Sequence, residues 1–362
     1  MSSPNASCAL ACRPRPKHGL APWLIATLLL LLAWGDARAA SASDAADGVA
    51  PAVAQARRAA LTRASAAVVG IEVTAVDEAR SISTLGRNRR GSGVVIADDG
   101  LVLTIGYLIL EADHTDLVLD DGRRIPARVI AYDQSTGFGL VQSLAPLPLP
   151  AVPLGNSGAV ATDEPLLVVV GGQAGDLGVA RMVSRRAFSG YWEYHIEDAL
   201  FTVPARSDHS GAGLFNVEGE LVGIGSLRVS NAAGPAAAPL AGNMFVPVSL
   251  LQPILGDLRR SGAASRGRAW LGVNCVEYEG EVRVIRTTAD GPAEAAGILA
   301  GDAILAVDGT AIADLGSFYK ALWADPRPDR EVTVDLRRGT RPLRLSVRAV
   351  DRLSTLRRPA GV

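Results

Sequence analysis

The residues best suited to covalent chemistry lie in the run Asp208–Gly213 (DHSGAG), which places a serine beside a histidine. A serine hydroxyl is a weak nucleophile unless a neighbouring base takes its proton. His209 adjoins Ser210, but adjacent side chains on an extended segment point to opposite sides. We therefore expect no base for Ser210 from its own segment.

Candidates for metal or thiol chemistry are weaker. His195, Glu197 and Asp198 are close in sequence, but their spacing is unspecific and we expect them on a surface loop. The chain has three cysteines, too few and too scattered for a disulfide framework or a cysteine zinc site: Cys8, Cys12 and Cys275. The sequence therefore predicts no metal and no cofactor.

The composition indicates a folded protein of two domains. The chain has 362 residues, of which 48% are hydrophobic and 20% charged, so it can bury a substantial core. Its 36 basic and 37 acidic residues give a net charge of −1. A balanced charge offers no argument for binding nucleic acid or an anionic membrane surface, and we expect no nucleic-acid partner.

The N-terminal residues 1–39 have the pattern of a secretory signal. Basic residues precede an apolar run of 12 residues, Trp23–Trp34, and a small-x-small site follows at Ala37 and Ala39. The run is shorter than the roughly 20 residues that span a bilayer. We expect cleavage after Ala39 and export to the periplasm or cell envelope. The alternative is an uncleaved anchor, which would make the protein a membrane-tethered adaptor.

The remaining chain divides into segments that differ in their pattern of apolar and turn residues. Residues 40–66 predict a mobile segment with a short helix, and residues 67–260 hold about a dozen short apolar runs separated by turn residues. Asp-Gly at 99–100 and 121–122 is a strong hairpin signal. This pattern predicts a mainly β domain built as a sandwich or a pair of barrels. The other expected segments are a linker over 261–268, a second compact unit over 269–350 and a tail over 351–362.

Several runs in the first unit resemble the HtrA/Deg family of trypsin-like serine proteases. Gly91–Thr104 (GSGVVIADDGLVLT) looks like the family's first barrel, and Ser210–Asn216 (SGAGLFN) looks like its nucleophile segment. Gly242–Val248 (GNMFVPV) is similar to the run that closes the protease domain. The resemblance implies a trypsin-like double β-barrel over residues 67–260. It also implies the family's usual activity, which is ATP-independent proteolysis of unfolded proteins.

The second unit resembles a PDZ domain. Asp290–Gly309 (DGPAEAAGILAGDAILAVDG) is close to the PDZ consensus, and Trp270–Val273 (WLGV) is similar to the carboxylate-binding loop. The resemblance implies a small β-barrel with two helices over residues 269–350. In such a domain the loop amides bind the terminal carboxylate of a peptide, which adds as a strand to the sheet.

The resemblance places two substitutions in the catalytic triad. The family's histidine motif aligns with Thr104–Ile109 (TIGYLI) and puts Tyr107 at the base position. Its aspartate motif aligns with residues 136–139 (TGFG) and puts Gly137 at the orienting position, while Ser210 remains as the nucleophile position. A tyrosine, with a pKa near 10, cannot act as the base at neutral pH, and glycine has no carboxylate.

Other residues offer no evident replacement. Lys320 is the only lysine after the signal and lies in the second unit, so a Ser–Lys pair is unavailable. His114 falls seven residues after the base position, and we expect it on the loop before the next strand. Asp208 stands where the family has a glycine whose N–H stabilises the oxyanion, and a carboxylate there would oppose negative charge.

The PDZ resemblance implies a peptide-binding site at the second unit. The backbone N–H groups of Leu271, Gly272 and Val273 would be the carboxylate donors, with Arg266 or Arg268 adding charge. Further candidates are Trp270 and Phe318, the latter on a helix expected over 315–324. For Trp270 and Phe318 the alternative is a role in the hydrophobic core.

These features together predict an exported HtrA/Deg-like PDZ protein that has lost proteolysis. It would bind peptides, unfolded proteins or an active protease relative, as a scaffold, regulator or chaperone-like factor, and we expect a homo-oligomer such as a trimer. The alternative is an active serine endopeptidase in protein quality control, which would use Ser210 with a non-standard base.

Overall fold

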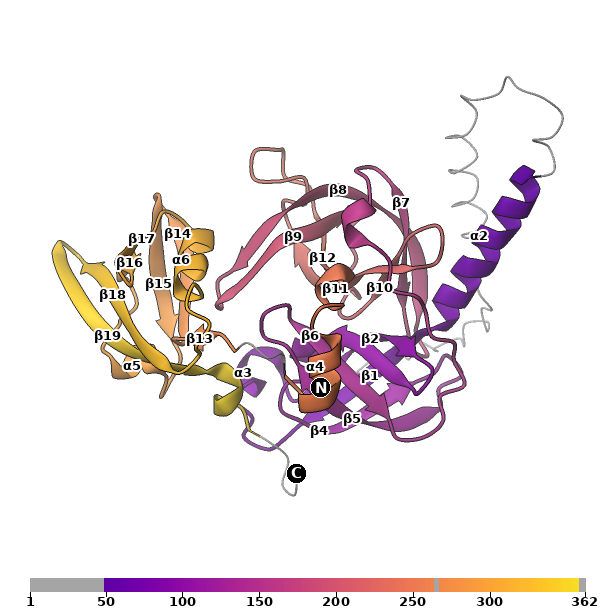
Figure 1. Ribbon diagram of the computed structural model, residues 1–362, viewed down its shortest axis with the longest axis horizontal. Helices are drawn as coiled ribbons and strands as arrows, with labels where there is room; N and C mark the ends of the chain where they lie inside the picture. The colour runs from indigo at the N-terminus through magenta and orange to yellow at the C-terminus, as the bar shows by residue number, and fades with distance from the viewer. Residues whose placement is uncertain (1–48, 264–266, 358–362) are drawn as a thin grey trace, which may run out of the picture.

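The computed structural model describes residues 49–263 and 267–357 (Figure 1). The expected signal over 1–39 with its cleavage site after Ala39, part of the expected linker, Arg266 and the end of the tail lie outside the described residues. Within them, no helix is long and apolar enough to cross a membrane.

The first barrel closes on itself in the order β1-β2-β3-β6-β5-β4. Gly100 and Gly122 both have positive φ, +81° and +85°, so the two Asp-Gly pairs form the turns of the β2–β3 and β4–β5 hairpins. The strands are β1 (Val68–Ala75), β2 (Asn88–Ala97), β3 (Leu101–Ile105), β4 (Ala112–Val118), β5 (Arg124–Tyr132) and β6 (Phe138–Ser143).

The second barrel closes in the order β10-β11-β12-β9-β8-β7. One hydrophobic cluster runs through both barrels, and it includes the fully buried Leu103 and Phe138 of the first and Phe201 and Phe215 of the second. The strands are β7 (Pro165–Val170), β8 (Asp176–Gly190), β9 (Tyr194–Val203), β10 (Gly213–Phe215), β11 (Leu221–Val229) and β12 (Gly242–Pro247).

Helices and 3₁₀ turns connect and flank the barrels. The longest, α2 (Val49–Ala66), leads directly into β1 and buries Leu61 and Ala64 against the barrel core. The others are α3 (Ile82–Leu85), α4 (Leu255–Ser261) and the 3₁₀ turns η1 (Gly106–Leu108), η2 (Ser157–Ala159) and η3 (Val248–Leu250).

The C-terminal unit has its own sheet and its own core. The sheet runs β13-β19-β18-β16-β15-β14, with β17 paired to β16, so β14 lies at an edge. Alternating residues of these strands pack on Phe318 and Tyr319 of α6. The elements are β13 (Ala269–Trp270), β14 (Val273–Tyr278), β15 (Glu281–Thr287), α5 (Pro292–Ala295), β16 (Ala303–Val307), β17 (Thr310–Ala311), α6 (Leu315–Leu322), β18 (Arg330–Arg338), β19 (Arg341–Asp351) and the turn η4 (Arg352–Thr355).

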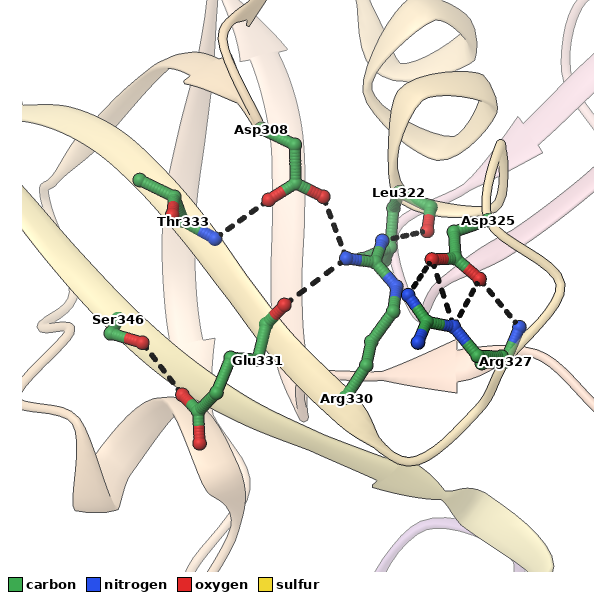
Figure 2. A network of polar contacts seen from close by, with 8 residues as sticks. All are labelled: Asp308, Leu322, Asp325, Arg327, Arg330, Glu331, Thr333 and Ser346. Carbon is green, nitrogen blue, oxygen red and sulfur yellow. Dashed lines mark hydrogen bonds and ion pairs between the residues drawn. The ribbon is translucent and has the colours of Figure 1, made fainter.

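A polar network fixes the C-terminal end of α6 to this sheet (Figure 2). The Arg330 guanidinium donates to the Leu322 carbonyl at 2.8 Å, which satisfies a free carbonyl at the end of the helix. It also pairs with the Asp308 carboxylate at 2.6 Å, and Asp308 accepts from the Thr333 amide at 2.8 Å. These bonds therefore link the last turn of α6 to the sheet.

The architecture confirms the predicted fold class. The chain is mainly β, with two closed six-stranded barrels followed by a smaller unit of one sheet and two helices. Figure 1 shows the β8–β9 pair extending from the second barrel toward the C-terminal unit. At the end of this pair, the Glu193 carboxylate accepts hydrogen bonds from amides of the C-terminal unit.

Candidate functional sites

The segment that carries Ser210 is held between the two barrels. The Ser210 carbonyl accepts a hydrogen bond from the Ser92 amide at 2.8 Å, and a Cβ at Gly91 would lie only 2.7 Å from that carbonyl oxygen. Gly211 has a φ of +74°, and any side chain there would strike the Ser92 carbonyl. The glycines of the two motifs are therefore needed for the close approach of these backbones.

Tyr107, which the sequence resemblance aligns with the base position, contacts the serine directly. It lies in η1, after β3, and its Oη is 2.7 Å from Ser210 Oγ and 2.9 Å from the Ser226 carbonyl oxygen. A carbonyl only accepts, so the single phenol proton goes to Ser226 and the Ser210 hydroxyl donates to Tyr107 Oη. The serine proton is thus held by an oxygen that already carries its own proton.

The surroundings of Tyr107 make it a poorer base still. Burial raises the pKa of the Tyr107 phenol to about 12, although the hydrogen bond from Ser210 lowers it. The phenol stays neutral throughout the physiological pH range. The Tyr107–Ser210 contact can therefore orient the serine but cannot activate it.

Gly137, which the sequence resemblance aligns with the orienting carboxylate, lies against a second tyrosine. Gly137 has a φ of +79°, and a Cβ there would lie 3.1 Å from Tyr194 Oη. Tyr194 is buried and donates to the Thr136 carbonyl at 2.7 Å. The nearby Asp133 carboxylate accepts from the amide and the hydroxyl of Thr136, at 2.8 and 2.6 Å.

The described histidines are engaged elsewhere. His114 is exposed on β4 beside Asp113, and not on a loop as expected. His195, Glu197 and Asp198 lie in β9 and not on a surface loop as expected. His195 is buried, and its Nδ1 lies 2.8 Å from Ser189 Oγ. His209 Nδ1 donates to the Arg206 carbonyl at 3.0 Å. Burial lowers the pKa of both His195 and His209. Among the described residues, Tyr107 alone has a side chain hydrogen-bonded to Ser210 Oγ.

Asp208 forms an ion pair with a neighbouring arginine. The Arg206 guanidinium binds both oxygens of Asp208, at 2.9 and 2.7 Å, and also contacts Asp176 at 3.0 Å. The expected repulsion of an oxyanion by Asp208 is therefore reduced by this pairing.

In the C-terminal unit, the amides of the carboxylate-binding loop converge on one acceptor. The N–H groups of Leu271, Gly272 and Val273 donate to the carboxylate of Glu193, at 3.0, 2.7 and 2.8 Å. Gly272 has a φ of +79°, which turns its amide toward the same point. Trp270 is 6% exposed, and Phe318 is completely buried in the core of this unit.

Glu193 comes from the tip of the β8–β9 hairpin. Its side chain is 1% exposed, and burial raises the pKa of the carboxyl to about 7 against the effect of the three amides and of Arg352. Its neutral titratable neighbours are Cys275, whose thiol pKa burial also raises, and Tyr319. A group so placed favours the protonated form more in the folded chain than in the unfolded one.

Sequence reasoning did not identify Glu193 or Tyr194. The local signal was a cluster of aromatic residues, Tyr191, Trp192 and Tyr194, in a chain with only 5% aromatics. Tyr194 bonds to Thr136, which is 58 residues away in the sequence, and Glu193 bonds to the loop at 271–273, up to 80 residues away. A contact at that separation leaves no periodic pattern.

Comparisons with known families agree with this architecture. Residues 91–224 match the trypsin-like peptidase domain family, and residues 269–349 match the PDZ domain family. A probable periplasmic serine endoprotease DegP-like of Pseudomonas fulva (strain 12-X) is 31% identical over 267 residues, which cover 69% of this chain and 54% of the relative. The corresponding protein of Marinomonas sp. (strain MWYL1) is 29% identical over 281 residues, covering 73% and 58%. The chain spans about half the length of these curated relatives.

Solved structures show the same fold. The HtrA-type protease AlgW with a decapeptide is 21% identical, with a TM-score of 0.52, over 84% of this chain and 99% of that chain. The serine endoprotease from Yersinia pestis is 23% identical, with a TM-score of 0.50, over 82% and 97%. The chain is thus a trypsin-like double barrel joined to a PDZ domain. It belongs to the HtrA/Deg-like family, whose named relatives are periplasmic serine endoproteases.

We expect Tyr107→Phe to destabilise the protein by about 1–3 kcal/mol. The change removes a half-buried hydroxyl and leaves the Ser226 carbonyl without its phenol donor. Urea unfolding measures the loss. Tyr278→Phe, at an exposed tyrosine of the PDZ domain, is the matched control and should change stability by less than about 0.5 kcal/mol. Equal effects of the two variants would contradict the assigned hydrogen bond.

Restoring the triad residues by substitution should fail to restore cleavage. Tyr107→His supplies an imidazole without an orienting carboxylate. Adding Gly137→Asp places a side chain at a φ of +79° and against Tyr194. We expect background hydrolysis of reduced casein by the single and the double variant, with the double variant about 1–3 kcal/mol less stable. Cleavage by the double variant that disappears on further Ser210→Ala would refute this account of the site.

The raised pKa of Glu193 predicts a pH-dependent contribution to stability. The folded chain retains a proton that the unfolded chain releases, so this contribution is present below about pH 4.5 and is lost as the pH rises through about 7. The melting temperature of Glu193→Gln relative to wild type should therefore increase by a few degrees between pH 5 and pH 8. Glu218→Gln, on an exposed turn, controls for the loss of a carboxylate. A pH-independent difference for Glu193→Gln would contradict the prediction.

Proposed function

We propose that this HtrA/Deg-like protein does not cleave proteins and acts instead by binding peptides or protein C-termini through its PDZ domain. The observation that carries the proposal is the contact of Tyr107 Oη with Ser210 Oγ at 2.7 Å, in the position of the catalytic base. In a comparable serine protease, loss of the histidine alone costs about 10⁶ in turnover. Here the orienting position is also closed, at Gly137.

The PDZ domain supports the binding half of this proposal. Its loop still directs the amides of Leu271, Gly272 and Val273 at a carboxylate, which is the chemistry needed to capture a chain terminus. The candidate peptide-binding residues are these three with Trp270 and Phe318. Ser210, Tyr107 and Gly137 would be remnants of a triad.

The cellular setting follows from the relatives and from the leader. The curated relatives are named periplasmic, and residues 1–39 predict an export signal. We place the protein in the periplasm or cell envelope, as a scaffold, regulator or chaperone-like factor for unfolded proteins or for an active relative. A homo-oligomer, such as a trimer, stays a prediction that sedimentation can test.

The proposal is tested by cleavage of reduced casein with residues 40–362 beside a Ser210→Ala control. We expect the same background loss of casein with both proteins over a pH range of 6 to 9, because Tyr107 remains neutral there. The competing function is active endoproteolysis, the activity in the relatives' names. Cleavage by the wild type that is absent from the Ser210→Ala protein would establish that function and overturn the proposal.

A further inference from the structure

The tip of the β8–β9 hairpin lies in the peptide groove of the PDZ domain. Gly190 pairs with Tyr194, so Tyr191, Trp192 and Glu193 form a three-residue loop. Glu193 has a φ of +58°, the left-handed conformation that commonly closes such loops. This conformation is uncommon for glutamate. It is accompanied here by insertion of the Glu193 side chain into the carboxylate-binding loop.

The Glu193 carboxylate makes the contacts that a chain terminus would make. Oε1 accepts from the amides of Gly272 and Val273, and Oε2 accepts from the amide of Leu271. These three donors are the ones expected from the sequence to bind a peptide's terminal carboxylate. With a side chain only 1% exposed, Glu193 leaves no room for a second carboxylate in the loop.

The backbone of the same tip also imitates a bound peptide. The Cys275 amide of the edge strand β14 donates to the Tyr191 carbonyl at 2.9 Å, which is a main-chain bond of the kind an added strand makes. On the opposite wall, the Tyr319 hydroxyl of α6 donates to the Gly190 carbonyl at 2.6 Å and accepts from the Glu193 amide at 3.2 Å. The tip is therefore bound by both walls of the groove.

Beside the tip, α6 also approaches the hairpin at Gly316, where a Cβ would lie 3.5 Å from the His195 ring. Lys320 of α6 pairs with Glu197 of β9 at 3.0 Å, but both side chains are about 60% exposed, and such pairs contribute little. A recess of about 340 Å³ remains open beside the tip, between Phe188–Trp192, Cys275–Glu277 and Leu315. The hairpin thus occupies the carboxylate end of the groove without filling its length.

We infer that residues 190–193 are an internal ligand of the PDZ domain, and that a protein C-terminus binds by displacing the Glu193 carboxylate from the loop. This inference rests on the proposed function, because it concerns the same peptide groove. Its ligand class is a peptide with a free terminal carboxylate, which can take the three amides and continue along β14. A peptide with an amidated terminus lacks this carboxylate and cannot replace Glu193 in this way.

The test compares peptide binding with the groove closed and open. Residues 40–362 are prepared as wild type, as Glu193→Ala, and with Tyr191-Trp192-Glu193 replaced by a two-residue Asn-Gly turn that shortens the tip. Glu218→Ala is the control for removing a carboxylate elsewhere. Fluorescence polarisation measures four labelled decapeptides that end in Ala, Val, Leu or Phe, each with a free and with an amidated terminus. Hydrogen exchange measures the amides of Leu271, Gly272 and Val273 without peptide.

We expect both tip variants to bind at least one free-carboxylate peptide tenfold or more tightly than wild type, and the amidated peptides not to bind. The three loop amides should exchange at least tenfold faster in the tip variants, while Glu218→Ala matches wild type in both measurements. Equal peptide affinity of wild type and tip variants would overturn the internal ligand and leave PDZ peptide binding intact.

Hydrogen exchange separates the two proposals if no peptide binds. Faster exchange of the loop amides in the tip variants, with no binding to any peptide, would support the docked hairpin and count against peptide binding as the function. Unchanged exchange in both tip variants would overturn the internal ligand whatever the peptides do. The shortened hairpin keeps the test decisive if Glu193→Ala unfolds.

Discussion

The three hydrogen bonds from the PDZ loop to the Glu193 carboxylate are the interaction on which the arrangement of this protein depends. They join the end of a barrel hairpin to the PDZ groove, and the next residue in the chain, Tyr194, lies against Gly137 in the first barrel. One short segment therefore fills two positions that a binding or catalytic partner would otherwise occupy. The rings of Trp192 and Tyr194, which flank Glu193 in the chain, stack with their centroids 5.7 Å apart.

The hydroxyl groups of Ser210 and Tyr107 form a hydrogen-bonded cluster with the Ser226 carbonyl. The Tyr107 hydroxyl donates a hydrogen bond to the Ser226 carbonyl and accepts one from the Ser210 hydroxyl, so each of these polar groups has a partner. An active triad needs an acceptor that can take on charge in a partly desolvated cleft, whereas a phenol fills the same space and stays neutral. Gly91 and Gly211 allow the close approach of the two barrels, and this packing does not depend on catalysis.

The sequence allowed the fold to be predicted and an altered triad to be proposed, but it did not reveal how the two domains meet. Alternating apolar residues and the Asp-Gly turns at 99–100 and 121–122 are local signals, and they predicted the barrels. Tyr107 and Gly137 could be located because they lie inside recognisable motifs. Glu193 lies in a loop with no motif, and its partners begin 78 residues later, so only the folded backbone reveals the contact. The burial of His195 was missed for the same reason, because Gly316 of α6, next to its ring, comes from the other domain.

Which ligands could open the groove depends on how strongly they bind compared with the tethered Glu193 carboxylate. A tethered carboxylate has a high effective concentration, on the order of millimolar for a short connection, so a free peptide competes at a disadvantage if it offers only a carboxylate. However, the internal ligand is poorly matched to its site, because burial opposes its charge and its loop contributes only one main-chain bond to β14. A protein C-terminus can pair with β14 over several residues and place side chains in the recess that the hairpin leaves open. Selectivity would then arise from contacts beyond the terminal carboxylate, and those contacts would have to exceed what Glu193, Tyr191 and Tyr319 provide together.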